Sequence, residues 1–172
     1  MSTKAQREAA EDARLQSLLE RECARREGLN PELWHAPQLW PDERERWAII
    51  GSRLYPDVLD VVRCVAALPP HVVVVSGGAR RVDSWAVYAA KHRGHRTETI
   101  AAEWKRLGVR AGPIRNAEII ESVVRVLAFP FGEAKGTNGA LDLARAEHKR
   151  RGRNGGQLPI FIFEHGKGWT RG

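Results

Sequence analysis

Apolar and polar positions follow two periods along the chain, and their alternation predicts an α/β fold. Four continuous apolar runs and one more polar run are typical of strands, at residues 47–51, 72–75, 126–129, 158–163 and 96–101. Apolar residues at helical spacing predict helices at 57–68, 80–92 and 114–122, and a last helix that begins at Thr137. This order specifies a mainly parallel five-stranded sheet covered on both faces, a three-layer sandwich.

The N-terminal part of the chain has a different pattern. Residues 3–27 are rich in Ala, Glu, Arg and Leu, which predicts a helix. Its narrow apolar stripe favours packing on the domain or on a second subunit of a homo-oligomer such as a dimer, and comprises Leu15, Leu18, Leu19 and Cys23. Trp34 and Trp40 in a Pro-rich connector either anchor this helix or stack on a ligand. The chain therefore divides into a helix with its connector, 1–46, and a domain, 47–172.

Composition excludes several classes of protein. The chain is 42% hydrophobic and 28% charged, and no apolar run reaches the roughly 18 residues that span a bilayer. The charged N-terminus lacks the apolar centre of a secretory signal, so we expect a cytoplasmic protein with no membrane partner. Cys23 and Cys64 have neither metal-ligand nor disulfide spacing, and the six histidines show no metal-binding pairs. We expect no metal site and no cofactor.

The formal charge of +7 is concentrated in the α/β part. Residues 1–47 hold 8 Lys/Arg and 10 Asp/Glu, whereas residues 48–172 hold 20 and 11. A positive field over the domain favours an anionic ligand, either a nucleotide or a nucleic acid.

Small, hydroxylated and basic residues cluster where the predicted strands end. Ligands of parallel sheets bind beyond the carboxyl ends of the strands, so we predict the site at this rim. The candidate ligand-binding residues there are Gly51, Ser52, Arg53, Ser76, Gly77, Gly78, Ala79, Arg80, Pro130, Gly132, Gly136 and Thr137. Gly136 permits close approach of the backbone, and Thr137 can both cap the following helix and donate its hydroxyl to an anion. A helix start of this kind attracts phosphate.

These motifs together resemble a known family. GSR after the first strand, SGGAR…VD after the second, AEWKRLG…AGPIRN before the third helix and AFPFG…GT after the fourth strand are similar, in matching order over about 47–163, to the YspA/YpsA-related group of the SLOG superfamily. That superfamily also includes DprA and the lonely-guy-type phosphoribohydrolases. The resemblance implies a Rossmann-like fold that binds a nucleotide or a nucleotide-derived ligand.

Two departures from the family pattern affect this interpretation. Arg81 stands where the family usually has glycine, which makes the second loop tighter or more basic. The phosphoribohydrolases carry a glutamate two residues after their GGxGT motif. This chain has no acid at the matching position after Gly136-Thr137-Asn138, so glycosidic cleavage by that route is not expected.

Charged and polar residues near the predicted rim have alternative roles. Arg53 and Arg115, at predicted loop–helix junctions, either hold a phosphate in two hydrogen bonds or are solvated. Asn116 either caps a helix or contacts the ligand. Asp83 could bind a ribose hydroxyl, hold Arg80, favour the helix dipole, or serve as a catalytic acid or base.

An irregular segment and a basic run complete the candidates. Glu103 and Trp104 precede an irregular stretch, 104–113, over the rim. There Glu103 could act as a catalytic acid or base, and Trp104 could stack on a base or pack structurally. The basic run at 148–153 either offsets the helix dipole or contacts the backbone of a nucleic acid.

Three functions fit these residues. The leading hypothesis is binding, or sensing, of a nucleotide or an NAD- or ADP-ribose-like metabolite at the rim. The alternative is a hydrolase that cleaves an N-glycosidic or phosphate bond of such a molecule, with Glu103 or Asp83 as the acid–base group. The second alternative is binding of single-stranded nucleic acid.

Overall fold

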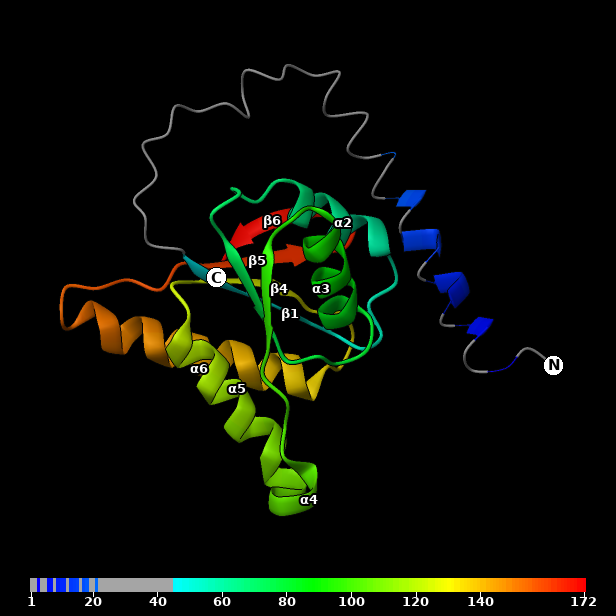
Figure 1. Ribbon diagram of the computed structural model, residues 1–172. Helices are drawn as coiled ribbons and strands as arrows, with labels where there is room; N and C mark the ends of the chain where they lie inside the picture. The colour runs from blue at the N-terminus through cyan, green and yellow to red at the C-terminus, as the bar shows by residue number, and fades with distance from the viewer. Residues whose placement is uncertain are drawn as a thin grey trace.

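The computed structural model describes residues 45–172 together with 3, 6–7, 9–11, 13–15, 17–18 and 21 of the N-terminal segment. Its centre is a six-stranded sheet in the order β3-β2-β1-β4-β5-β6, with helices on both faces (Figure 1). The strands are β1 (Arg46–Gly51), β2 (Val73–Ser76), β3 (Arg96–Thr99), β4 (Arg125–Phe129), β5 (Ile160–Glu164) and β6 (Gly168–Arg171). The helices are α2 (Val58–Ala66), α3 (Val82–His92), α4 (Trp104–Leu107), the 3-10 helix η2 (Gly108–Arg110), α5 (Ala111–Ser122) and α6 (Lys135–Gly152).

The first five strands are parallel, as the sequence predicts, and the sixth is an antiparallel edge strand. From β1 the chain proceeds to β2 and β3 on one side of the sheet. It then returns past β1 to β4 and β5 on the other side. The strand order therefore reverses between β1 and β4, the topological switch point of a doubly wound, Rossmann-like sheet.

Alternate residues of β1 explain the two apolar layers. Trp47 and Ile49 belong to a buried cluster with residues of α2 and α3, whereas Ala48 and Ile50 belong to a second cluster with residues of α5 and α6. Successive side chains of a strand point to opposite faces, so each face of the sheet has its own core. Figure 1 shows the pairs α2/α3 and α5/α6 on opposite sides of the sheet.

The N-terminal segment contacts the first of these cores. Leu15 is buried there, and the indole Nε1 of Trp85 donates a hydrogen bond to Glu11 Oε1 at 3.0 Å. Packing on the domain is thus seen for Leu15, while the homo-oligomer stays a prediction. The predictions for the remaining residues of this segment concern positions outside the described residues, namely Leu19, Cys23, Trp34 and Trp40.

The prediction that residues 104–113 are irregular is wrong. It forms α4, η2 and the first turn of α5, which begins at Ala111 rather than at Ile114. The start of α5 was placed too late because Gly112 and Pro113 are helix breakers in a helix interior. In a first turn proline loses no hydrogen bond, because its missing N–H would have no partner there.

Two further differences lie at the C-terminal half. The last long helix begins at Lys135, not at Thr137, and a short strand, β6, was not predicted. The sequence of β6, GWTR, lacks a clear period of alternating apolar residues. The strand follows a turn in which Gly166 adopts positive φ, and its first residue, Gly168, also has positive φ. Within the described part of the chain, no helix is long and apolar enough to cross a membrane.

Candidate functional site

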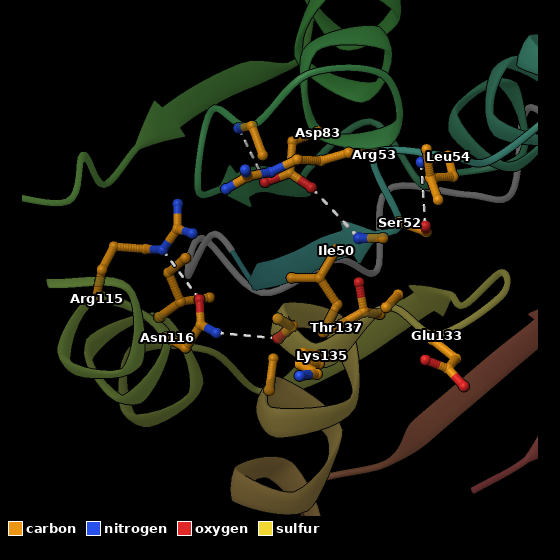
Figure 2. Close-up of a pocket in the computed structure, with 16 residues that line it drawn as sticks. Ile50, Ser52, Arg53, Leu54, Asp83, Arg115, Asn116, Glu133, Lys135 and Thr137 are labelled. Carbon is orange, nitrogen blue, oxygen red and sulfur yellow. Dashed lines mark hydrogen bonds between the residues drawn. The ribbon is translucent and has the colours of Figure 1, made fainter. Parts of the chain in front are cut away.

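A cleft of about 320 Å³ lies beyond the carboxyl ends of β1 and β4, at the switch point (Figure 2). It is formed by the end of β1 and the loop after it, the start of α3, the middle of α5 and the start of α6. The lining residues are Ile50, Gly51, Ser52, Arg53, Leu54, Ala79, Asp83, Arg115, Asn116, Ile119, Glu133, Ala134, Lys135, Gly136, Thr137 and Ala140. Crevices at this position of doubly wound sheets are their usual ligand sites.

The end of β1 is held tightly against α3. A Cβ atom on Gly51 would lie 2.6 Å from Cγ1 of Val82, so only glycine lets the helix approach the strand this closely. The next residue, Ser52, is buried. Its amide donates to the carbonyl of Phe129 at 3.0 Å, and its Oγ accepts the amide of Leu54 at 3.1 Å. The floor of the cleft is therefore rigid backbone.

Asp83, the second residue of α3, joins two of the rim loops. It is 4% exposed, and its two carboxylate oxygens accept the amides of Gly51 at 3.3 Å and Ala79 at 3.2 Å. Burial raises the pKa of Asp83, while the bond from Ala79 and the nearby charge of Arg115 oppose this rise. Of the roles considered for Asp83, the structure shows neither a bond to Arg80 nor a carboxylate with both oxygens free for a ligand.

Arg115 lies in the second turn of α5, with its guanidinium half-buried at the cleft. Its Nη1 donates to the carbonyl of Gly77, and its Nε donates to Oδ1 of Asn116 at 3.0 Å. A Cβ atom on Gly77 would overlap the guanidinium, so glycine there makes room for this arginine. Burial lowers the pKa of Arg115, but an arginine stays protonated in proteins. Among the described residues, no acceptor bonds its Nη2, which leaves this group available to an anion.

Asn116 connects α5 to α6. Its Nδ2 donates to the carbonyl of Gly136 at 3.2 Å while its Oδ1 accepts the bond from Arg115 (Figure 2). Asn116 is the sixth residue of α5, so its interpretation as a helix cap is wrong. It lines the cleft, and it fixes the guanidinium relative to the first turn of α6.

The N-terminus of α6 faces the cleft without a cap. Its N-cap, Ala134, has no side-chain acceptor. The amides of Gly136 and Thr137 donate no hydrogen bond to an acceptor among the described residues. Thr137 is buried in the first turn, so the prediction that it caps the helix is wrong. The helix dipole adds positive potential at this end.

The ionic side chains at the mouth of the cleft are mostly basic. Arg53 and Lys135 are exposed, and Arg53 lies close enough to Arg115 to lower its pKa further. The acids are Asp83, whose oxygens are occupied by amides, and Glu133. The cleft therefore carries three cations against one exposed carboxylate, which favours an anionic ligand.

The structure brings together nine of the predicted site residues, which are Gly51, Ser52, Arg53, Ala79, Asp83, Arg115, Asn116, Gly136 and Thr137. Others lie apart. Ser76 and Gly77 lie behind the lining, and Gly78 and Arg80 line a neighbouring cavity. Pro130 and Gly132 precede the lining residues of their loop.

Glu103 and Trp104 do not line the cleft. They are at the start of α4, which projects away from the sheet (Figure 1). Glu103 pairs with Arg106, whose charge and hydrogen bonds lower the pKa of the carboxyl. Trp104 is 53% exposed and its ring edge covers Gly112.

Sequence reasoning missed several lining residues, chiefly Leu54, Glu133, Lys135 and Ile119. Glu133 and Lys135 were overlooked because the start of α6 was placed at Thr137, two residues too late. A signal was present, since both charges lie within the Gly132–Gly136 stretch. Leu54 and Ile119 are apolar and carry no chemical signal of their own.

One group of described residues has the composition of a metal site. Ligand atoms of Asp57, Asp60 and His165 lie within 4.8 Å of one another. Asp57 is the N-cap of α2, and its side chain accepts a hydrogen bond from the amide of Leu59. Asp60 Oδ2 accepts a hydrogen bond from the hydroxyl of Tyr55 at 2.9 Å and lies 2.9 Å from His165 Nδ1. These contacts join the β1–α2 loop to the β5–β6 turn, so we assign the group to structure.

The basic run at the end of α6 is largely engaged within the protein. Arg150 and Arg151 pair with Glu147, and they lower the pKa of this carboxyl to about 2. Arg151 also donates to the carbonyls of Val123, Ile120 and Glu121 at the end of α5, at 2.7, 3.3 and 3.1 Å. This arginine caps α5 from a neighbouring helix, a role that sequence reasoning did not consider.

The fold and the cleft define a doubly wound α/β protein with a crevice lined mainly by basic ionic side chains at its switch point. No protein-family model matches the chain. The Gene 61 protein of Mycobacterium phage D29 is 36% identical over 103 residues, which cover 54% of this chain and 82% of that protein. The chain therefore belongs to the family of this phage protein.

Among solved structures, the chain is similar to DNA processing protein A (DprA) from Streptococcus pneumoniae, with a TM-score of 0.44 and 19% sequence identity. The match covers 66% of this chain and 58% of that protein. Less than two thirds of DprA thus has a counterpart here.

Proposed function

We propose that the protein binds a nucleotide or a nucleotide-derived metabolite in the switch-point cleft. One observation carries the proposal: the unbonded amides of Gly136 and Thr137 and the available Nη2 of Arg115 line the same cleft. Backbone amides at a helix N-terminus and a guanidinium are the usual protein ligands of phosphate. A phosphoryl group of the ligand is bound between them.

Other residues of the cleft hold these phosphate-binding groups in position. Asp83 fixes the loops that carry Gly51 and Ala79, and Asn116 fixes Arg115 against α6. The exposed cations Arg53 and Lys135 attract the anion into the cleft. The motifs that resemble the SLOG superfamily support the proposal, because each of them contributes residues to this lining.

Hydrolysis of the ligand is a second candidate function, and Glu133 favours it. This exposed glutamate lines the cleft beside the start of α6, and among the described residues it forms no ion pair. It could act as a general base toward a water next to the phosphoryl group. Glu103 does not line the cleft, and Asp83 has both oxygens occupied by amides.

Binding of a single strand of nucleic acid is the other alternative. The arm formed by α4 and η2 exposes Trp104 and Val109 beside the basic residues Lys105 and Arg110. An exposed aromatic ring among cations suits base stacking and contact with phosphates. In this alternative the arm contributes to binding together with the cleft.

One experiment separates the three functions. The purified protein is incubated at several salt concentrations with a panel of nucleosides, nucleotides and single-stranded DNA oligonucleotides, and each mixture is separated by chromatography into free, bound and converted molecules. A nucleotide that is bound and recovered unchanged supports the proposal, and a converted nucleotide supports the hydrolase. Binding of single-stranded DNA alone, with a steep fall in affinity as salt rises, supports the second alternative. If no nucleotide binds, the proposal is wrong.

A further inference from the structure

A second cavity, of about 900 Å³, lies beside the cleft, beyond the carboxyl ends of β2 and β3. Its walls come from the N-terminal segment, the loop after β2 and the outer face of α3. The residues that the argument uses are Arg14, Gly78, Ala79, Arg80, Arg81 and Lys91. Ala79 also lines the cleft, so the two hollows meet at this residue.

The segment between the two hollows, which we call the Ala79 ridge, has only small side chains. It is built by Gly78 and Ala79, which carry no side chain larger than a methyl group. Gly78 has a φ of +67°, and a Cβ atom there would lie 2.8 Å from Cγ2 of Thr99, so glycine is required on both counts. The hydrogen bond from the amide of Ala79 to Asp83 holds this loop against the first turn of α3. No side chain of this segment that is longer than a methyl group therefore separates the two hollows.

The second cavity is more basic than the cleft. Arg14, Arg80 and Lys91 are exposed on its walls, and within the described residues none of them forms an ion pair or a hydrogen bond through its side chain. Its one acid, Glu11, accepts the bond from Trp85. Three unpaired cations on the walls of the second cavity favour a second anionic group of a ligand there.

Arg81 is held at this cavity by an unusual backbone. Its φ of +64° is the one positive value among the non-glycine residues that the structure describes. Its Nη1 donates to the carbonyl of Tyr55 at 2.9 Å, and its guanidinium lies 5.7 Å from the centre of the Trp85 ring. Strained residues of this kind gather at binding sites. Arg81 and its neighbour Arg80 both line the second cavity.

We infer that the cleft and the second cavity form one site for a ligand of dinucleotide size. Its phosphoryl group occupies the cleft, and the second half, a sugar or a nucleoside, crosses the Ala79 ridge into the basic cavity. This inference rests on the proposed function, and it names the class of ligand: a nucleoside joined through phosphate to a second sugar or nucleoside. Both a metabolite such as ADP-ribose and the phosphorylated end of a single strand have this chemistry.

The test compares AMP, ADP-ribose and the 5′-phosphorylated dinucleotide pdApdA by isothermal titration calorimetry. The full-length protein, the variant Arg14→Glu/Lys91→Glu and the control Lys149→Glu/Arg153→Glu are titrated at one salt concentration. Both double variants change the net charge equally, but Lys149 and Arg153 lie at the far end of α6, outside both hollows. Melting curves confirm that all three proteins are folded.

We expect the parent to bind one of the two larger ligands at least tenfold more tightly than AMP. Arg14→Glu/Lys91→Glu should lose that advantage and keep the affinity for AMP, and the control should keep both. A preference for ADP-ribose assigns the site to a metabolite, and a preference for pdApdA assigns it to a strand end. If AMP binds but the larger ligands bind no more tightly, or if the control loses the advantage equally, the inference is overturned while the proposed function stands. If none of the ligands binds, both fail.

Discussion

Asn116 Nδ2 donates a hydrogen bond of 3.2 Å to the carbonyl of Gly136, which joins the middle of α5 to the first turn of α6. The same side chain accepts the Nε–H of Arg115. The guanidinium and the uncapped helix start therefore keep one relative position before any ligand arrives. Preorganised donors of this kind bind an anion without the cost of ordering them first.

Gly136→Glu should abolish nucleotide binding and leave the protein folded. A Cβ atom at Gly136 meets no atom within 4 Å, so a side chain fits there, but its carboxylate would occupy the place of the phosphoryl group. Gly139→Glu is the matched control, because Gly139 is also open, lies on the same helix and does not line the cleft. Calorimetric titration with nucleotides measures both. Retained affinity in Gly136→Glu would refute the role of this turn.

Asp83 should make stability depend on pH. Burial raises its folded-state pKa above the usual 3.8, so the folded protein holds the proton more tightly than the unfolded chain does. Its contribution to the free energy of unfolding is therefore largest at low pH and falls as the pH rises through the folded-state pKa.

The variant Asp83→Asn cannot ionise, so it isolates this contribution. We expect its stability relative to the parent to improve as the pH rises from about 4 to about 7. Urea unfolding of both proteins across this range measures the difference. A difference that is constant with pH would show that Asp83 has the same pKa in both states.

The sequence was informative about the rim because the signals there are local. Apolar runs that end in Gly51-Ser52-Arg53 or in Ser76-Gly77-Gly78 predict strand ends, and parallel strands bring those ends to one edge. Arg115 was likewise identified from the residues around it. The register of the sheet then confirmed that these segments meet.

Other features depend on contacts between distant residues, which no local pattern encodes. The cap that Arg151 forms on α5 connects residues about thirty positions apart. The start of α6 was misplaced because it has no capping side chain to mark it. Glu103 and Trp104 were assigned to the rim because they follow β3, but α4 carries them away from the sheet.

Arg81 should be strained, and replacing it tests this. Arg81→Ala and Arg81→Gly both lose the bond to Tyr55 and the contact with Trp85, but only glycine relieves the positive φ. We expect Arg81→Gly to be more stable than Arg81→Ala by about 1 to 3 kcal/mol. Urea unfolding of the two variants gives this difference directly. Equal free energies would mean that the backbone changes conformation in the alanine variant.

We expect Arg151 to contribute to the stability of the fold, unlike the exposed Arg153 of the same basic run at 148–153. Arg151→Ala removes three bonds to the end of α5 and one to Glu147, so we expect it to lose about 1.5 to 3 kcal/mol of stability. Arg153→Ala should change stability by less than about 0.5 kcal/mol, because Arg153 is exposed and its side chain forms no hydrogen bond or ion pair with the residues that the structure describes. Thermal unfolding compares the two variants. Similar losses for both would indicate a general charge effect on the helix.

The central claim is that Arg115 and the first turn of α6 together bind a phosphoryl group. Removing one charged partner typically costs about 1.5 to 3 kcal/mol, so Arg115→Ala should weaken nucleotide binding by roughly one to two powers of ten. Arg115→Lys should recover only part of this loss, since lysine keeps the charge but lacks the planar pair of donors. Melting curves show whether the variants are folded, which is needed because Arg115 also bonds Gly77.

The most direct measurement is isothermal titration of the parent, Arg115→Ala and Arg115→Lys with each common nucleoside and its 5′-monophosphate. We predict that the parent binds one monophosphate at least tenfold more tightly than its nucleoside, and that Arg115→Ala removes this difference while the affinity for the nucleoside stays the same. Equal loss of affinity for the nucleoside and the monophosphate would contradict the claim, because Arg115 would then shape the loop at Gly77 without contacting phosphate.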